Sequence, residues 1–140
     1  MSTTARTPFL GTYILIFLAT MIGIGVVLFL ISALTGVQIS NGGMAILPPM
    51  IAAIFTGKRW GAAIGAVPEN RIAWRFAIVA AIATVAVQIL IALGVLAAMG
   101  DSAAGVAPLI AGAMVLYTAL VIIVNRWFLG FGAKASIRAK

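Results

Sequence analysis

Residues 9–34, FLGTYILIFLATMIGIGVVLFLISAL, decide the class of fold because they form an apolar run without a charged side chain. About 20 residues are enough to cross a bilayer as a helix. The apolar part of a secretory signal covers only about 7–15 residues, so this run is too long to be one, although the basic Arg6 precedes it. The run therefore predicts a retained membrane-spanning helix.

The composition of the whole chain indicates the same environment. Of its 140 residues, 64% are hydrophobic and 8% are charged, whereas a soluble domain has roughly 45–50% apolar and about 25% charged residues. A soluble core cannot account for this excess. The length suits one compact bundle, so we expect a single transmembrane domain over residues 1–140.

Three further apolar segments follow the first, separated by polar or turn-rich breaks. The breaks are TGVQISNGG at 35–43, GAAIGAVPENR at 61–71 and GDSAAG at 100–105. The expected spans cover about 39–56, 74–99 and 107–127. Pro49 removes a backbone donor, so we expect a kink or a broken start in the second span. The prediction is an all-α integral membrane bundle of four transmembrane helices.

Positive charges set the expected orientation, because Lys and Arg resist translocation and stay on the cytoplasmic side. With four spans, all the cations fall on one side: Arg6, Lys58, Arg59, Arg71, Arg75, Arg126, Lys134, Arg138 and Lys140. We therefore expect a multi-pass protein of the bacterial inner (cytoplasmic) membrane with both termini in the cytoplasm. The alternative has three spans, with residues 39–67 at the interface and the N-terminus outside.

Trp60, Trp74 and Trp127 all fall at the expected cytoplasmic boundary. An indole at this depth can bury its ring and still hydrogen-bond, so we interpret the three as interface anchors. A stacking platform for a ligand is the alternative. It would need converging polar groups that the sequence does not show.

Small and polar residues at helical spacing predict which faces of the spans meet, because helices in lipid associate through close packing and a few hydrogen bonds. On the third span the expected inner stripe is Ala73, Ala77, Ala81, Thr84, Gln88 and Ala92, and the expected outer stripe is Ile78, Ile82, Val85, Ile89, Leu93 and Leu96. The inner positions expected elsewhere are Thr12, Ala19 and Gly23 in the first span and Ala111, Thr118 and Asn125 in the fourth. Gln88 needs a partner near mid-bilayer, such as a backbone carbonyl or the Thr118 hydroxyl. A place on a polar substrate path is the alternative.

The loop between the second and third spans is the most distinctive charged region. Lys58, Arg59, Arg71 and Arg75 cluster there around the single acid Glu69. Such clusters determine topology and bind anionic lipid headgroups, which are the membrane partner we expect. The more specific alternative is that these residues bind an acidic surface of another protein.

The ionisable residues argue against most chemistry. The chain has no Cys and no His, and its only carboxylates, Glu69 and Asp101, fall at opposite faces of the expected bundle. This excludes thiolate and imidazole metal sites and an acid–base carboxylate pair. Cations sit only beside apolar segments, which is not typical of a nucleic-acid surface. We expect no enzyme, cofactor, metal or nucleic-acid partner.

Several local features resemble an uncharacterised family of small four-span inner-membrane proteins of proteobacteria. They are SNGG at 40–43, the exit of the second span at 57–60, and Pro68 followed by an acid and arginines. The resemblance covers about half of the chain and departs from the family pattern in placing Glu69 next to Pro68. It implies location and topology but no activity.

Two functions from different classes fit these observations. The first is a non-enzymatic accessory or assembly subunit that packs with itself, as a homo-oligomer, or with a larger membrane complex. The second is a facilitator or channel for a small neutral or lipidic solute, for which Gln88, Thr118 and the break at Pro48 and Pro49 supply the candidate path.

Overall fold

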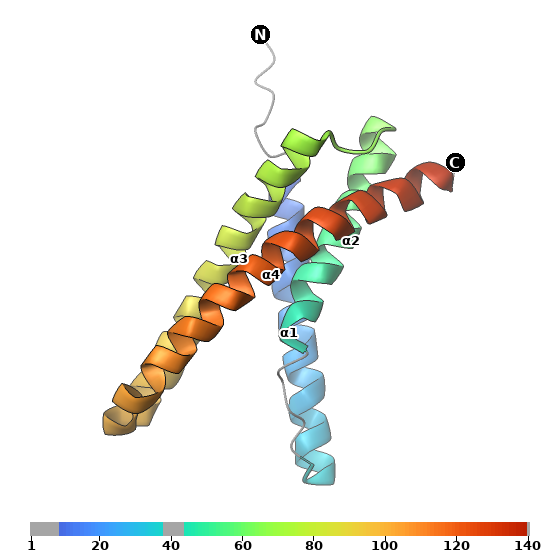
Figure 1. Ribbon diagram of the computed structural model, residues 1–140. Helices are drawn as coiled ribbons and strands as arrows, with labels where there is room; N and C mark the ends of the chain where they lie inside the picture. The colour runs from blue at the N-terminus through green and yellow to red at the C-terminus, as the bar shows by residue number, and fades with distance from the viewer. Residues whose placement is uncertain (1–8, 38–43, 140) are drawn as a thin grey trace.

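The computed structural model describes residues 9–37 and 44–139, and every regular element within them is helical. The elements are α1 (Leu10–Thr35), the short 3-10 helix η1 (Met44–Ile46), α2 (Leu47–Ile64), α3 (Asn70–Met99), the 3-10 turn η2 (Gly100–Ser102) and α4 (Ala103–Arg138) (Figure 1). The predicted all-α class is therefore confirmed.

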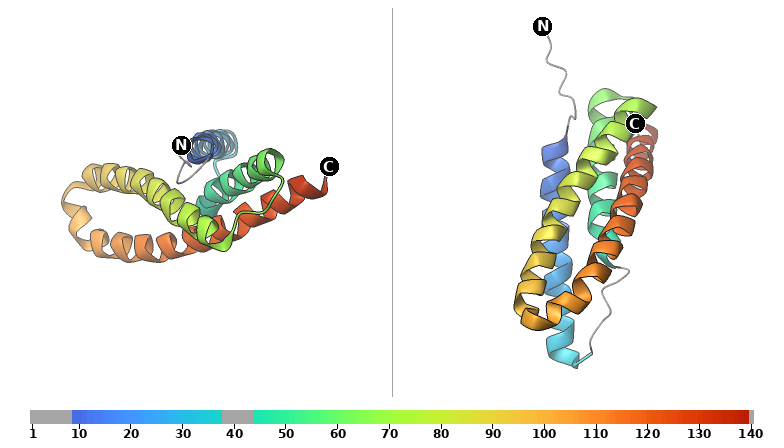
Figure 2. Two further views of the ribbon diagram at one scale, coloured as in Figure 1. Left: turned by 90° about the horizontal axis from the view of Figure 1, so that it is seen from above. Right: turned by 60° about the vertical axis from the view of Figure 1, so that its left-hand side comes forward.

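The helices are packed tightly at one end of the molecule and separate at the other (Figures 1 and 2). Buried residues lie in the first half of α1, throughout α2, in the first half of α3 and in the second half of α4. We call this part the closed end. The remaining halves of α1, α3 and α4 form the open end, where α1 is one leg and the α3–α4 hairpin is the other.

Two helical stretches are long and apolar enough to cross a membrane. One is α1, and the other runs from Asn70 to Arg138, which turns back on itself at η2 so that α3 and α4 lie side by side (Figure 2). At 1.5 Å per residue, α1 is about 39 Å long and α3 about 45 Å. Both exceed the roughly 30 Å of a hydrocarbon core.

The helix at the second predicted span differs from the expectation of 39–56. Residues 39–43 lie outside the described ranges, and α2 begins at Leu47 and continues past the cations Lys58 and Arg59. Because it contains these charges, α2 is not among the stretches apolar enough to cross. Its charge-free part, 47–57, is only about 16 Å long. Pro48 and Pro49 lie in its first turn, where their missing N–H groups cost little, so they start the helix and do not kink it.

The backbones of α2 and α4 approach each other closely. A Cβ added to Gly57 would collide with the backbone carbonyl of Leu129, and one added to Gly132 would collide with that of Ile54. At Gly61, a Cβ would lie 2.5 Å from the carbonyl oxygen of Ala133. Gly57 and Gly61 are four residues apart on one face of α2, the small-residue spacing that lets two helices approach closely.

Alanine at Gly57 or Gly132 should therefore weaken the fold. The added methyl group has no space and must push α2 and α4 apart, an overpacking that typically costs about 1–3 kcal/mol. The free energy of unfolding, measured by denaturant titration of the detergent-solubilised protein, should fall by about this amount.

Gly23 and Gly112 are matched controls, because a Cβ at either position meets nothing within 4 Å. Alanine there should leave stability unchanged or raise it slightly, since glycine is a poor helix former. Equal losses at all four positions would contradict the close α2–α4 contact.

Candidate functional site

A buried set of polar side chains ties three helices together at the closed end. The Tyr13 hydroxyl of α1 donates to Oδ1 of Asn125 on α4 at 3.0 Å and lies 3.0 Å from Oγ1 of Thr84 on α3. All three residues are fully buried. The Tyr13 ring packs edge-on against Phe76 and parallel to Phe17, so the hydroxyl is held in place by the rings around it.

The expectation that Thr84 and Asn125 face the interior is confirmed, but their common partner Tyr13 was not identified. The inner stripe expected on α3 is also confirmed over Ala73, Ala77 and Ala81. On the other two helices the expectation was wrong at Ala19, Gly23 and Ala111, which are exposed. Gly23 and Ala111 lie in the open-end halves of α1 and α4, whereas Ala19 lies in the first half of α1 on a face that no other helix covers.

Gln88 and Thr118 do not form the expected pair. The Thr118 hydroxyl donates at 2.7 Å to the carbonyl of Met114 in its own helix. Gln88 is half-buried and interacts with the hydroxyl of Tyr117, which donates at 3.0 Å to the carbonyl of Ala45 in η1. Neutral polar groups of α3, α4 and η1 therefore meet where the two legs begin to separate.

Two shallow clefts lie on either side of this meeting point. One, of about 220 Å³, is lined by Met21, Ile24, Gly25, Leu28, Met44, Ala45, Pro48, Gln88 and Ile91. The other, of about 250 Å³, is lined by Ala45, Gln88, Ile110, Ala113, Met114 and Tyr117. Their walls are mostly apolar, and Gln88 and Ala45 belong to both.

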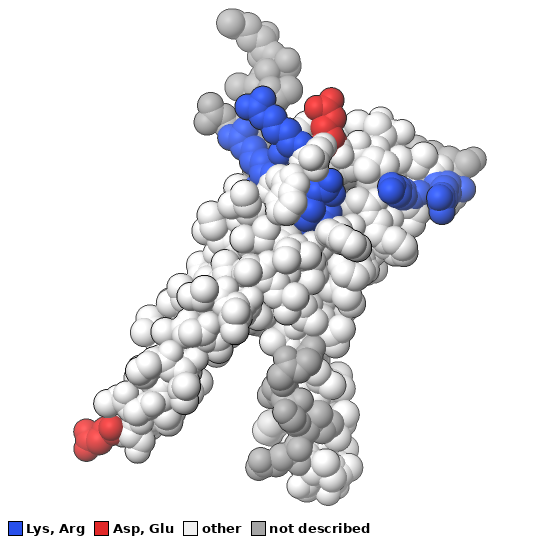
Figure 3. Space-filling view, in the orientation of Figure 1, with Lys and Arg blue, Asp and Glu red and all other residues white. Residues whose placement is uncertain are grey.

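The charged side chains gather at the closed end, and an acidic group marks the far tip of the α3–α4 leg (Figure 3). Of the cations expected to contact headgroups or a partner, Arg59 donates to Oγ1 of Thr12 at 3.2 Å and Lys58 lies over the ring of Phe55. Arg71 and Arg75 are exposed on the first turns of α3, and Glu69 is the exposed residue immediately before that helix.

The three tryptophans have different surroundings. Trp74 and Trp127 are 43% and 74% exposed at the closed end, as interface anchors would be. Trp60 is only 4% exposed and packs edge-on against Phe9, so its interpretation as an anchor was wrong. The contact that buries Trp60 comes from the residue just before α1, 51 positions earlier in the chain.

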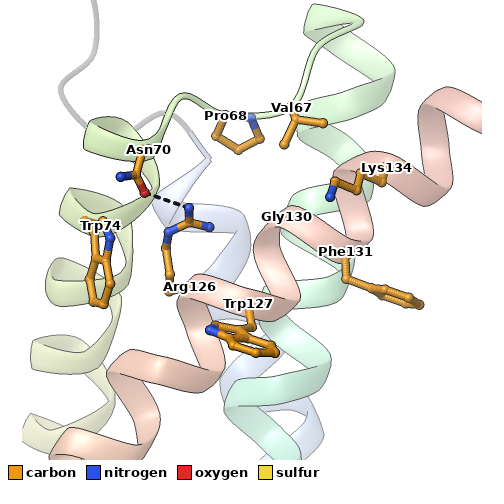
Figure 4. Close-up of a pocket in the computed structure, with 9 residues that line it drawn as sticks. All are labelled: Val67, Pro68, Asn70, Trp74, Arg126, Trp127, Gly130, Phe131 and Lys134. Carbon is orange, nitrogen blue, oxygen red and sulfur yellow. Dashed lines mark hydrogen bonds between the residues drawn. The ribbon is translucent and has the colours of Figure 1, made fainter.

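A pocket of about 550 Å³ lies at the closed end between the start of α3, the loop before it and α4. Its lining residues are Val67, Pro68, Asn70, Trp74, Arg126, Trp127, Gly130, Phe131 and Lys134 (Figure 4). We call it the cationic pocket. None of these nine residues is acidic, and none of the five charged residues expected as contacts from the sequence lines it.

The Arg126 guanidinium is the central group of the cationic pocket. Its Nη2 donates at 2.8 Å to Oδ1 of Asn70, and its central carbon lies 6.0 Å from the centre of the Trp74 ring. Its Nε is buried without a hydrogen-bond partner. Two contacts with α3 thus fix the orientation of a partly buried cation (Figure 4).

Sequence reasoning missed Arg126 and Lys134 as site residues, treating them only as topology determinants. A usable signal was present in RWFLGFGAK, residues 126–134. Arg126, Gly130 and Lys134 recur every four residues and therefore share one helix face. Among the described residues no group of three His, Cys, Asp or Glu side chains could hold a metal ion.

Comparisons with protein-family models, curated proteins and solved structures find no significant match to the chain. The site has therefore to be interpreted from its own geometry.

Removing the Tyr13 hydroxyl should destabilise the protein while leaving its shape intact. Tyr13→Phe keeps the buried ring but leaves Thr84 and Asn125 without their shared partner. Hydrogen bonds between helices in lipid average about 0.6 kcal/mol and reach about 1.7 kcal/mol. Because this hydroxyl serves two partners, we expect a loss of about 1 kcal/mol in the free energy of unfolding.

Tyr117→Phe is the matched control, since its hydroxyl bonds a carbonyl at an exposed position, and it should cost less. In an Asn125→Leu background the effect of Tyr13→Phe should shrink, because part of the interaction is already absent. Additive effects of these two substitutions would show that the Tyr13–Asn125 hydrogen bond does not contribute.

Proposed function

We propose that the chain is a four-span protein of a bacterial inner membrane that acts, without catalytic chemistry of its own, as an accessory or assembly subunit packed against other membrane helices. The observation that carries the proposal is the open end. There the two legs expose large apolar side chains that no other part of the described chain covers, among them Val26, Phe29, Leu30, Leu34, Leu90, Leu93, Leu109, Val115 and Leu116.

Exposing the apolar side chains of the open end to water would be unfavourable. Soluble monomers rarely expose contiguous apolar patches larger than a few hundred Å². In lipid the same surface is stable, and separated helices offer faces to other proteins. The gathering of the cations at the closed end supports an orientation with that end in the cytoplasm.

Contacts between helices support an alternating path through the membrane. The start of α1 meets the end of α2, because Arg59 bonds Thr12 and Phe9 packs on Trp60. The start of α3 meets the later part of α4 through Asn70 and Arg126. The closed end thus contains the start of α1, all of α2, the start of α3 and the end of α4, so consecutive long helices run in alternate directions, as a four-span path would have them.

Single cysteines can test this path, because the chain has no Cys. A membrane-impermeant maleimide applied to the outer face of the inner membrane should label Val37→Cys and Ser102→Cys but not Ala66→Cys. Val37 distinguishes the models, since it lies outside with four spans and inside with three. Protection of Val37→Cys together with labelling of Ser102→Cys would overturn the four-span path.

A second function is favoured by the two apolar clefts that share Gln88 and Ala45. They lie where the legs separate and suit a facilitator for a small neutral or lipidic solute. This path needs no titratable relay.

One purification distinguishes the two functions. Native purification of the accessory subunit should recover an oligomer or a co-purifying membrane protein. A strict monomer without a partner contradicts that proposal, and solute flux in proteoliposomes that Gln88→Leu abolishes would then support the facilitator. Flux unchanged by Gln88→Leu would remove the proposed path.

A further inference from the structure

We propose that the cationic pocket binds the phosphate group of an anionic phospholipid. The inference rests on the membrane insertion proposed above but not on the accessory role. It differs from the general attraction of a basic surface, because it assigns the headgroup to Arg126 and Lys134, which line the pocket, and not to Lys58, Arg71 and Arg75, which lie outside it.

The spacing of the two cations creates the cavity between them. Arg126, Gly130 and Lys134 lie one above the other on α4, and four residues of helix rise about 6 Å. The two cationic residues therefore begin about 12 Å apart, with no side chain between them. Their long side chains can both reach a group placed over Gly130 (Figure 4).

Arg126 is oriented for an anion that the described residues do not provide. Asn70 is neutral and binds one terminal nitrogen, and Trp74 covers one side of the guanidinium. The other terminal nitrogen, Nη1, lies over Gly130, 3.8 Å from where a Cβ on that residue would be. A partly buried cation is costly unless it is paired. A phosphate can accept two parallel hydrogen bonds from a guanidinium, a geometry that arginine favours.

The aromatic residues around the pocket favour a lipid over a free phosphate ion. Trp127 and Phe131 are 74% and 61% exposed, and Trp74 is 43% exposed. Trp side chains concentrate at the depth of the headgroups. A lipid whose phosphate lies between Arg126 and Lys134 would contact these rings with its glycerol and upper acyl chains, whereas free phosphate would leave them unused. The volume of about 550 Å³ lies within the range of small-molecule sites.

The experiment measures binding of phosphatidylglycerol to the full-length protein in a neutral detergent, by the rise in melting temperature as lipid is added. Phosphatidylcholine and inorganic phosphate are the comparison ligands. Phosphatidylglycerol should raise the melting temperature at concentrations where the other two do not. Lys134→Gln should weaken its apparent affinity about fivefold, the effect expected for one cation at a lipid surface. Gly130→Leu keeps every charge but fills the cavity, and should abolish the response.

Arg71→Gln is the matched control, because it removes one exposed cation at the same end but outside the pocket. It should leave the affinity unchanged. If Arg71→Gln and Lys134→Gln weakened the affinity for phosphatidylglycerol equally, a specific site in the cationic pocket would be overturned in favour of diffuse attraction to the basic surface. An equal response to inorganic phosphate would overturn the lipid assignment, and an equal response to phosphatidylcholine would overturn recognition of net negative charge. None of these results depends on the cysteine labelling or the co-purification, so the site and the proposed function can fail separately.

Discussion

The direct contact between the α2 and α4 backbones is the constraint on which the rest of the structure depends. Gly57, Gly61 and Gly132 allow the two helices to touch along the closed end. This contact fixes the rotation of α4, which turns Asn125 towards Tyr13 and Thr84. The same rotation directs the neighbouring Arg126 towards Asn70 at the start of α3. One pair of helices thus positions both the buried polar set and the cationic pocket.

The two ends of the molecule are stabilised by different interactions. At the closed end, small residues, stacked rings and shared hydrogen bonds hold four helices together. At the open end α1 leaves the α3–α4 hairpin, and large apolar side chains are exposed (Figure 1). Neutral polar groups of Gln88, Tyr117 and Ala45 mark the boundary between the two. A substitution should therefore have different effects in the two ends even where the residue types match.

The class of fold could be predicted from the sequence because the length of an apolar run and the positions of the breaks are local properties. The inward placement of Thr84 and Asn125 followed from their polarity and from their helical spacing relative to small residues, since neither side chain is favourable against lipid. Tyr13 was missed because a tyrosine within an apolar run looks like any other large side chain until its neighbours are known. Trp60 was misplaced because it packs against Phe9, a residue far away in the sequence. Both errors concern long-range contacts, which a single chain pattern does not contain.

The partners in the buried polar set are synthesised at different times, so the core can form only after the first helix has been made. Tyr13 lies 112 positions before Asn125 and 71 before Thr84. A ribosome adds about 5–20 residues per second, so the tyrosine is synthesised roughly 6–22 s before its amide partner. During that interval the Tyr13 hydroxyl of α1 lacks its final acceptor, and a polar group of a neighbouring molecule can hydrogen-bond to it instead. The order of the chain therefore leaves the Tyr13 hydroxyl without its acceptor on α4 until that helix has been made.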